Sequence, residues 1–141
     1  MDPAIENALA ITPASTARDR TVDITTIGAR TGRARRIEVW FYRVDGQIYL
    51  TTQPAQRSWY ANILANPSFT FHLKHNVHAD LPVVGTPIRD PHLRETVFRS
   101  IIADLEQHWN PAGIPLPVQP LQQWMDGSPL IHVEFTEGPS S

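Results

Sequence analysis

The chain has 141 residues, a formal net charge of −2 and no cysteine. This size and charge are typical of one globular domain and argue against a general nucleic-acid or membrane-surface binder, and the lack of cysteine excludes disulfides and thiolate metal sites. The N-terminus lacks a basic start followed by an apolar run, and no apolar stretch reaches the length of a membrane span, so we expect a cytoplasmic protein. We expect a partly helical or disordered segment over 1–20, a single domain over 21–136 and a flexible tail over 137–141.

The first half of the chain predicts three strands. Residues 21–27 are rich in β-branched side chains, which is typical of a strand. Residues 36–44 alternate an aliphatic face with a mixed polar and aromatic face, and this period of two also predicts a strand. Asp45-Gly46 tolerates positive φ at both positions, so it predicts a tight hairpin turn. Residues 47–52 then return antiparallel.

The second half predicts three helices inserted between three further strands. Helical spacing of apolar residues predicts helices over 58–66, from 91 to about 108, and over 120–126. Period-two alternation predicts strands over 68–75, 78–85 and 129–136. Residues 110–120 hold four prolines and predict an extended connection. Together these elements predict an α+β, mainly β fold: a mostly antiparallel sheet curled into a barrel, with about three flanking helices.

Residues 28–36 read GARTGRARR, so four of the twelve basic residues fall in one connection between two predicted strands. Guanidinium groups hold phosphate or carboxylate in bidentate fashion, and several arginines in one loop repel each other unless they share an anion. Gly28 and Gly32 let the backbone turn tightly and bring its N–H groups close to a ligand. The residues alone leave two interpretations open, an anion site and a solvated, positively charged turn.

Three histidines are spaced three apart, at His72, His75 and His78. On a helix this spacing would gather them on one face as metal ligands. On the strands predicted here, His75 points away from His72 and falls near a turn. We therefore expect surface histidines and no metal site.

Two sequence elements occur together around the arginine-rich connection. The first consists of Thr25, Thr26, Gly28, Arg30, Thr31, Gly32 and Arg35, and the second of Trp59, Tyr60, Asn62, Leu64, Ala65, Asn66 and Pro67. In this order, on either side of an Asp-Gly hairpin, they resemble the deazaflavin (F420)-dependent nitroreductase and quinone reductase family. The resemblance covers roughly residues 21–75, about half of the chain.

The resemblance implies an antiparallel split β-barrel of the FMN-binding type that binds coenzyme F420. The coenzyme's phosphate and oligoglutamate tail carry several negative charges, which the loop would neutralise through Arg30, Arg33, Arg35 and Arg36, alongside Thr31 and Gly32. The end of the third strand would lie near the phosphate or ring, with Thr51, Thr52 and Gln53. Trp59 and Tyr60 would border the ring, although a spacing of four residues from Ile63 favours a core position for Trp59.

This chain departs from the family pattern at two places. Members commonly carry a lysine and paired glycines after the third strand, and this chain has neither, so Arg57 is the candidate replacement for the cation. Members that reduce nitro compounds often present tyrosines near the C-terminal helix. Here Trp109 and Trp124 stand in that part of the chain, either as an aromatic wall or as packing residues.

The resemblance implies hydride transfer from the reduced coenzyme to a small organic acceptor, such as a quinone, a nitroaromatic or an activated C=C bond. The acceptor then needs a proton, for which Tyr60, a nearby hydroxyl or water are the candidates. The alternatives are an FMN- or FAD-dependent oxidoreductase on the same barrel and a non-catalytic cofactor carrier. We expect a homodimer, because such barrels often pair through their sheets.

Overall fold

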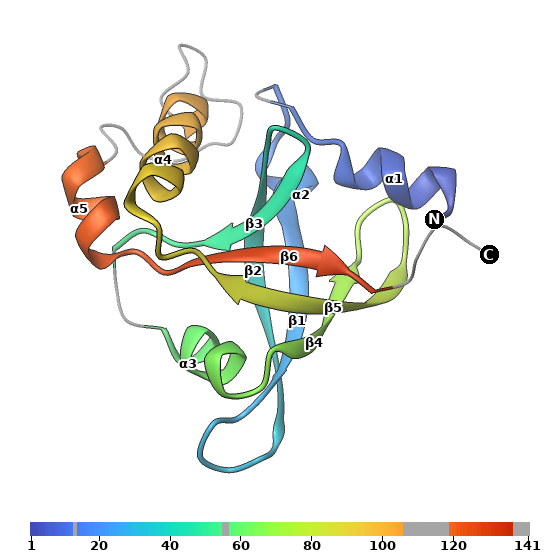
Figure 1. The fold of residues 1–141 in the computed structure, drawn as a ribbon. Coiled ribbons are helices and arrows are strands. Elements are labelled where there is room, and N and C mark those ends of the chain that lie inside the picture. The colour runs from blue at the N-terminus through green and yellow to red at the C-terminus, as the bar shows by residue number, and fades with distance from the viewer. Residues whose placement is uncertain (13, 55–56, 106–118, 137–141) are drawn as a thin grey trace.

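The computed structural model describes residues 1–12, 14–54, 57–105 and 119–136, and its centre is a closed six-stranded barrel (Figure 1). The strands are β1 (Thr21–Ile27), β2 (Ala34–Val44), β3 (Gln47–Thr51), β4 (Ser68–Leu73), β5 (Ala79–Pro87) and β6 (Leu130–Phe135). They run in the order β1-β2-β3-β6-β5-β4, and every pairing, including the one between β4 and β1 that closes the barrel, is antiparallel. The predicted antiparallel barrel is therefore confirmed.

Five helices accompany the barrel in the described part of the chain: α1 (Pro3–Leu9), α2 (Ala17–Arg20), α3 (Ser58–Ala65), α4 (Pro91–Leu105) and α5 (Leu121–Gly127). The last three are the predicted helices between strands. The first two lie in the N-terminal segment, where α2 begins with a capping box in which the Thr16 side chain and the Asp19 side chain each accept a backbone N–H. No described helix has both the length and the apolar character needed to cross a membrane.

The β2–β3 hairpin forms as its turn residues predict. Asp45 and Gly46 both have positive φ, at 51° and 77°, and the strands pair directly on either side, from Val44 opposite Gln47 to Phe41 opposite Leu50. This is the geometry that a two-residue turn needs to match the twist of the strands.

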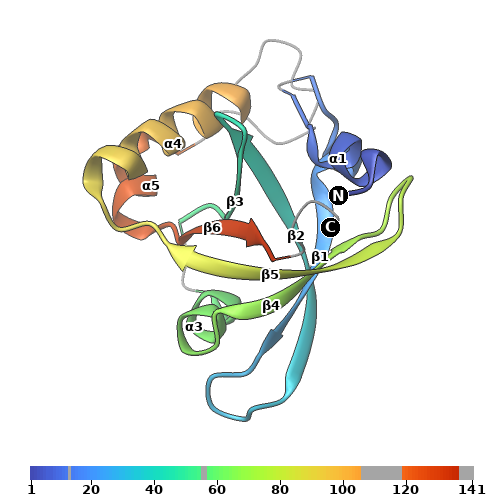
Figure 2. The same cartoon turned by 45° about the vertical axis from the view of Figure 1, so that its right-hand side comes forward.

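Two apolar clusters hold the structure together. The first fills the barrel with residues such as Ile24, Phe41 and Phe71 and continues onto α1 and α3. The second lies between the outer face of β2 and β3 and helices α4 and α5, where Trp124 is fully buried against Phe98, with ring centroids 5.7 Å apart. Trp124 is thus a packing residue, while Trp109 lies outside the described residues. Figure 2 shows α4 and α5 together on one side of the barrel, with α3 at its lower end.

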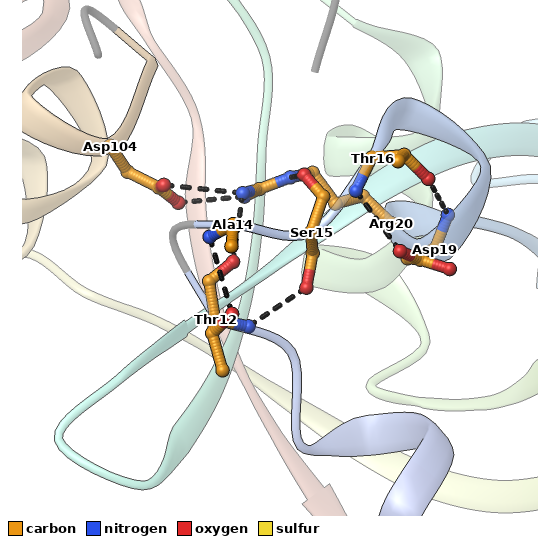
Figure 3. Close-up of polar contacts among 7 residues, drawn as sticks. All are labelled: Thr12, Ala14, Ser15, Thr16, Asp19, Arg20 and Asp104. Atoms are coloured by element: carbon orange, nitrogen blue, oxygen red, sulfur yellow. Dashed lines mark hydrogen bonds and ion pairs between the residues drawn. The ribbon is translucent and has the colours of Figure 1, made fainter. Parts of the chain in front are cut away.

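A buried arginine ties the N-terminal segment to α4 (Figure 3). Arg20 is 1% exposed, and its two terminal nitrogens donate to the Asp104 carboxylate at 2.6 and 3.1 Å. The remaining contacts go to the carbonyl oxygens of Ser15 and Thr12. Such a bidentate pair fixes both position and angle, so Arg20 holds α4 in place over the barrel wall.

Candidate functional site

The arginine-rich connection between β1 and β2 is a closed turn. Gly32 has a φ of 67°, and a Cβ on Gly28 would lie 2.5 Å from the Thr31 hydroxyl oxygen, so both positions favour glycine. The Gly28 N–H donates to the Arg33 carbonyl, and the Gly32 N–H donates to the Gly28 carbonyl. Both glycine N–H groups are therefore used inside the turn and are not available to a ligand.

Helix α3 holds this turn in place through Asn62. The Asn62 side chain is buried, accepts the Ala29 N–H at 2.9 Å and donates to the Thr26 hydroxyl at 3.1 Å. One turn later, the Asn66 side-chain amide lies 3.4 Å from the Ile27 carbonyl oxygen. Asn62 thus fastens the helix to both sides of the point where β1 enters the turn.

A cleft of about 1020 Å³ opens beside the turn and α3. One side is lined by Gly28, Ala29, Arg30, Thr31, Arg35, Arg57, Ser58, Tyr60, Ala61, Asn62 and Leu64. The other side is lined by Arg94 of α4 and by the turn between α5 and β6, with Asp126, Gly127, Ser128 and Pro129. This volume is at the upper end of the range for small-molecule sites, about 300–1,000 Å³.

Among the described residues, the cleft is lined by four arginines and one carboxylate, that of Asp126. In the described part of the chain, Arg30, Arg35 and Arg57 make no ion pair, and the only side-chain hydrogen bond among them runs from Arg57 Nε to the Thr52 hydroxyl at 3.3 Å. Helix α3 begins here, and its N-cap, Arg57, makes no side-chain capping bond. Uncompensated cations and the positive end of a helix favour an anion in this place.

The structure brings together five of the predicted site residues: Arg30, Thr31, Arg35, Arg57 and Tyr60 all line the cleft. Gly32 and Arg33 are exposed elsewhere on the turn.

The remaining predicted residues do not line the cleft. Arg36 is on the opposite face of β2, where its Nε donates to the Asp23 carboxylate at 2.9 Å. Trp59 is 5% exposed and packs in the barrel core, as its spacing from Ile63 indicates. At the end of β3, Thr51 is buried and donates to the Pro129 carbonyl. In the loop that follows, Thr52 accepts from Arg57 and Gln53 accepts from Gln119.

The sequence interpretation missed the residues on the second side of the cleft. Arg94 donates to the carbonyl oxygens of Ile88, Met125 and Ser128 at 3.0, 2.8 and 3.1 Å, and its guanidinium lies 5.0 Å from the centre of the Phe98 ring. Burial lowers the pKa of Arg94, and the charge interaction with Tyr60 partly opposes this shift. The only local signal was an arginine placed four residues before an aromatic residue on a predicted helix.

The three histidines do not gather, and the expectation of surface histidines is wrong for His72, which the strand pairing buries between Thr25 and Asp80. His72 is buried, with its Nδ1 2.6 Å from the Asp80 carboxylate and its Nε2 2.7 Å from the Thr25 hydroxyl. His75 is half-buried and His78 is exposed. Within the residues that the structure describes, no group of three potential metal ligands is present.

Comparison with known proteins places the chain in a family. The family model of the F420H(2)-dependent quinone reductase matches residues 14–118. The chain belongs to this family. No functionally curated protein matches the chain.

Solved structures support the split-barrel fold that the reductase family adopts. A conserved hypothetical protein from Mycobacterium tuberculosis has a TM-score of 0.62 at 19% identity, over 96% of this chain and 81% of that one. A structure named as an F420 reductase has a TM-score of 0.54 at 19% identity, over 82% and 86%. The heme storage protein from Vibrio cholerae has a TM-score of 0.59 at 12% identity, over 86% and 87%. At these identities the likeness concerns the fold.

The residues of the cleft fit the coenzyme that the reductase family is named for. A phosphate and a polyglutamate tail need several cations that are not already neutralised, and Arg30, Arg35 and Arg57 meet that requirement. Arg57, the candidate replacement for the missing lysine after β3, lies on the cleft wall at the start of α3.

Proposed function

We propose that this protein is an F420H2-dependent oxidoreductase that transfers a hydride to a small organic acceptor. The observation that carries the proposal is the set of arginines in the cleft, Arg30, Arg35 and Arg57, which have no carboxylate partner among the described residues. The family match supports the choice of coenzyme, and the volume of the cleft leaves room for a ring and an acceptor together.

In this proposal the chain's own residues bind and orient. Arg30 and Arg35 hold the anionic tail, and Arg57 together with the first turn of α3 holds the phosphate. Tyr60, half-buried on the cleft wall, borders the ring and is the candidate proton donor to the reduced acceptor. When bound, the reduced deazaflavin supplies the hydride, so the protein needs no nucleophile or metal of its own.

A pair of matched double variants tests the binding role. Arg30→Ala with Arg35→Ala removes two cations that line the cleft, whereas Arg33→Ala with Arg36→Ala removes two cations from the same segment that do not line it. Both variants lose the same net charge. Titration of the protein with oxidised F420, followed by absorbance or fluorescence, should give a dissociation constant at least about tenfold higher for the first pair, equal to about 1.4 kcal/mol. The dissociation constant of the second pair should stay within about threefold of the parent's value, because these two arginines act on the cleft only through long-range electrostatics. Equal weakening by both pairs would refute specific binding at Arg30 and Arg35.

The same protein preparation can be used to test the two alternative functions. An FMN- or FAD-dependent enzyme on this barrel would bind those flavins more tightly than F420 in parallel titrations. A carrier would bind F420 but would not oxidise it in the presence of menadione, a nitroaromatic or an enoate. Gel filtration with light scattering tests the proposed homodimer.

A further inference from the structure

Arg94 is a second cationic feature of the cleft, on the wall opposite the arginine turn. It projects from the first part of α4 and connects three segments through the carbonyl oxygens of Ile88, Met125 and Ser128. These contacts fix the guanidinium against the turn that follows α5. The arginine turn and α3 form the other wall, so the cleft has a cation on each side.

The contacts of Arg94 leave its positive charge uncompensated. All three of its hydrogen bonds end on neutral carbonyl oxygens, and no ion pair involves it within the described residues. Asp126 lines the same wall and keeps its negative charge, but among the described residues it makes no ion pair with Arg94, and its carboxylate accepts from the neutral Gln122 amide. A guanidinium has five N–H donors. Three have partners here, so Nε and one hydrogen of Nη1 are without an acceptor in the part of the chain that the structure describes.

A second polar group on this wall also lacks a partner. The Ser128 hydroxyl oxygen is buried and has no hydrogen-bond partner among the described residues, although Ser128 lines the cleft. Buried hydroxyl groups are nearly always paired, so an unpaired one beside a cleft is typical of a place where a ligand or water completes the bonding. The wall therefore holds a fixed cation and, within the described residues, an unpaired buried hydroxyl on the residue whose carbonyl that cation binds.

We infer that Arg94 stabilises the negative charge that an oxygen-bearing acceptor gains when it is reduced in the cleft. This inference rests on the proposed function and names the wall where the acceptor binds. A quinone that accepts a hydride gains one proton and two electrons, and one of its oxygens is left with a negative charge. That oxygen then takes one proton, from solvent or from Tyr60, to give the hydroquinone. A cation held in place before the reaction stabilises the anionic oxygen without having to reorganise.

The inference predicts selectivity by charge, which separates it from a merely structural role. Menadione is neutral and becomes an anion when it accepts a hydride. The N-methylphenazinium cation becomes neutral in the same step, so Arg94 has no developing anion to stabilise. Removing the positive charge at Arg94 should therefore slow menadione reduction and leave N-methylphenazinium reduction unchanged or faster.

Two neutral variants test this. Arg94→Met keeps an apolar stem against Phe98, and Arg94→Gln keeps an amide that can donate to the carbonyl oxygens. We expect the ratio of kcat/KM for menadione to kcat/KM for N-methylphenazinium to fall by about 10- to 100-fold in both. The ratio does not depend on the fraction of folded protein. Arg94→Lys, which keeps the charge, should retain most of the parent's ratio.

A binding measurement complements the kinetics. The parent saturated with oxidised F420 should bind the anion of 2-hydroxy-1,4-naphthoquinone more tightly than neutral menadione, and Arg94→Met should lose about tenfold in affinity for the anion only. An equal loss for both acceptors, or no change for either, would overturn the inference. If the parent does not bind F420 at all, the proposed function fails and this inference fails with it, whereas normal F420 binding with an unchanged ratio overturns the inference alone.

Discussion

Asn62 is the residue whose loss should connect stability most directly with coenzyme binding. Replacing it with Leu keeps the size of the side chain but removes the bond to the Ala29 N–H at 2.9 Å and the bond to the Thr26 hydroxyl at 3.1 Å. Each ordinary hydrogen bond contributes about 1 kcal/mol. Ala29 is exposed, so water can replace its partner, but Thr26 is 1% exposed and its hydroxyl would be left buried with no partner from Asn62. Leaving such a group unpaired costs about 1–3 kcal/mol. We therefore expect Asn62→Leu to lower the free energy of unfolding by about 2–4 kcal/mol.

Urea denaturation followed by tryptophan fluorescence measures this loss, and titration with oxidised F420 measures its effect on binding. The arginine turn loses its attachment to α3, so its side chains are less well positioned and the dissociation constant should rise about tenfold or more. Ala65→Ser, on the same helix at an exposed position that does not line the cleft, is the control for a general effect on α3. The reasoning is refuted if the free energy of unfolding of Asn62→Leu lies within about 0.5 kcal/mol of the parent's value. It is also refuted if the variant is destabilised as expected but binds F420 as tightly as the parent.

Three further predictions follow from buried or paired polar groups. Arg20→Met removes both hydrogen bonds to the Asp104 carboxylate and should lower the free energy of unfolding, measured by urea denaturation, by about 3–5 kcal/mol. The control, Arg18→Met at an exposed position, should change it by less than about 0.5 kcal/mol. Burial raises the pKa of the Asp23 carboxyl, but hydrogen bonds and charges from Lys74 and Arg36 outweigh burial and hold the pKa below its usual range. The unfolded state therefore binds the Asp23 proton more tightly than the folded state does. The stabilisation from Asp23 is complete above the ordinary carboxyl pKa of about 4 and disappears as the pH falls through the pKa of the folded state. Asp23→Asn should therefore reduce the fall in the midpoint of urea denaturation between about pH 5 and pH 3. Ser128→Ala removes a buried hydroxyl that has no partner among the described residues, so it should raise the thermal unfolding midpoint of the coenzyme-free protein. An unchanged or lower midpoint would show that the hydroxyl does have a partner.

The fold was predictable because its signals are local. The β-branched run over 21–27, the Asp45-Gly46 turn and the apolar stripe of α4 each act within a few residues, and each element forms where these signals lie. The two N-terminal helices carry weaker signals. The capping box that starts α2 consists of Thr16 with an aspartate three residues later, which is less distinctive than the glutamate of the usual pattern.

The arginine turn was predictable as a cationic segment, but its division into two faces needed the strand register. Arg35 and Arg36 are neighbours on β2, so their side chains point to opposite sides of the sheet. The register places Arg35 opposite Thr26 and Arg36 opposite Thr25. Only the first lines the cleft, and the second meets Asp23 on the outer face. Alternation alone indicates that the two differ, and only the position of α3 determines which of them faces the cleft.

The second wall of the cleft has no comparable signal in the sequence, and the reason is the way in which the wall is built. Arg94 donates to three carbonyl groups, the most distant of them 34 residues along the chain. Ser128 lies beside the cleft because α5, which precedes it, packs on α4. Backbone acceptors are the same at every residue, so no residue type marks a carbonyl that will receive an arginine. The turn after α5 therefore depends on Arg94 for its position, and the wall that we propose for the acceptor, lined by Arg94 and Ser128, depends on the second apolar cluster being formed. Variants in that cluster should weaken acceptor binding before they weaken F420 binding. The arginine turn, which we propose as the coenzyme site, is attached through Asn62 of α3 and does not depend on this cluster.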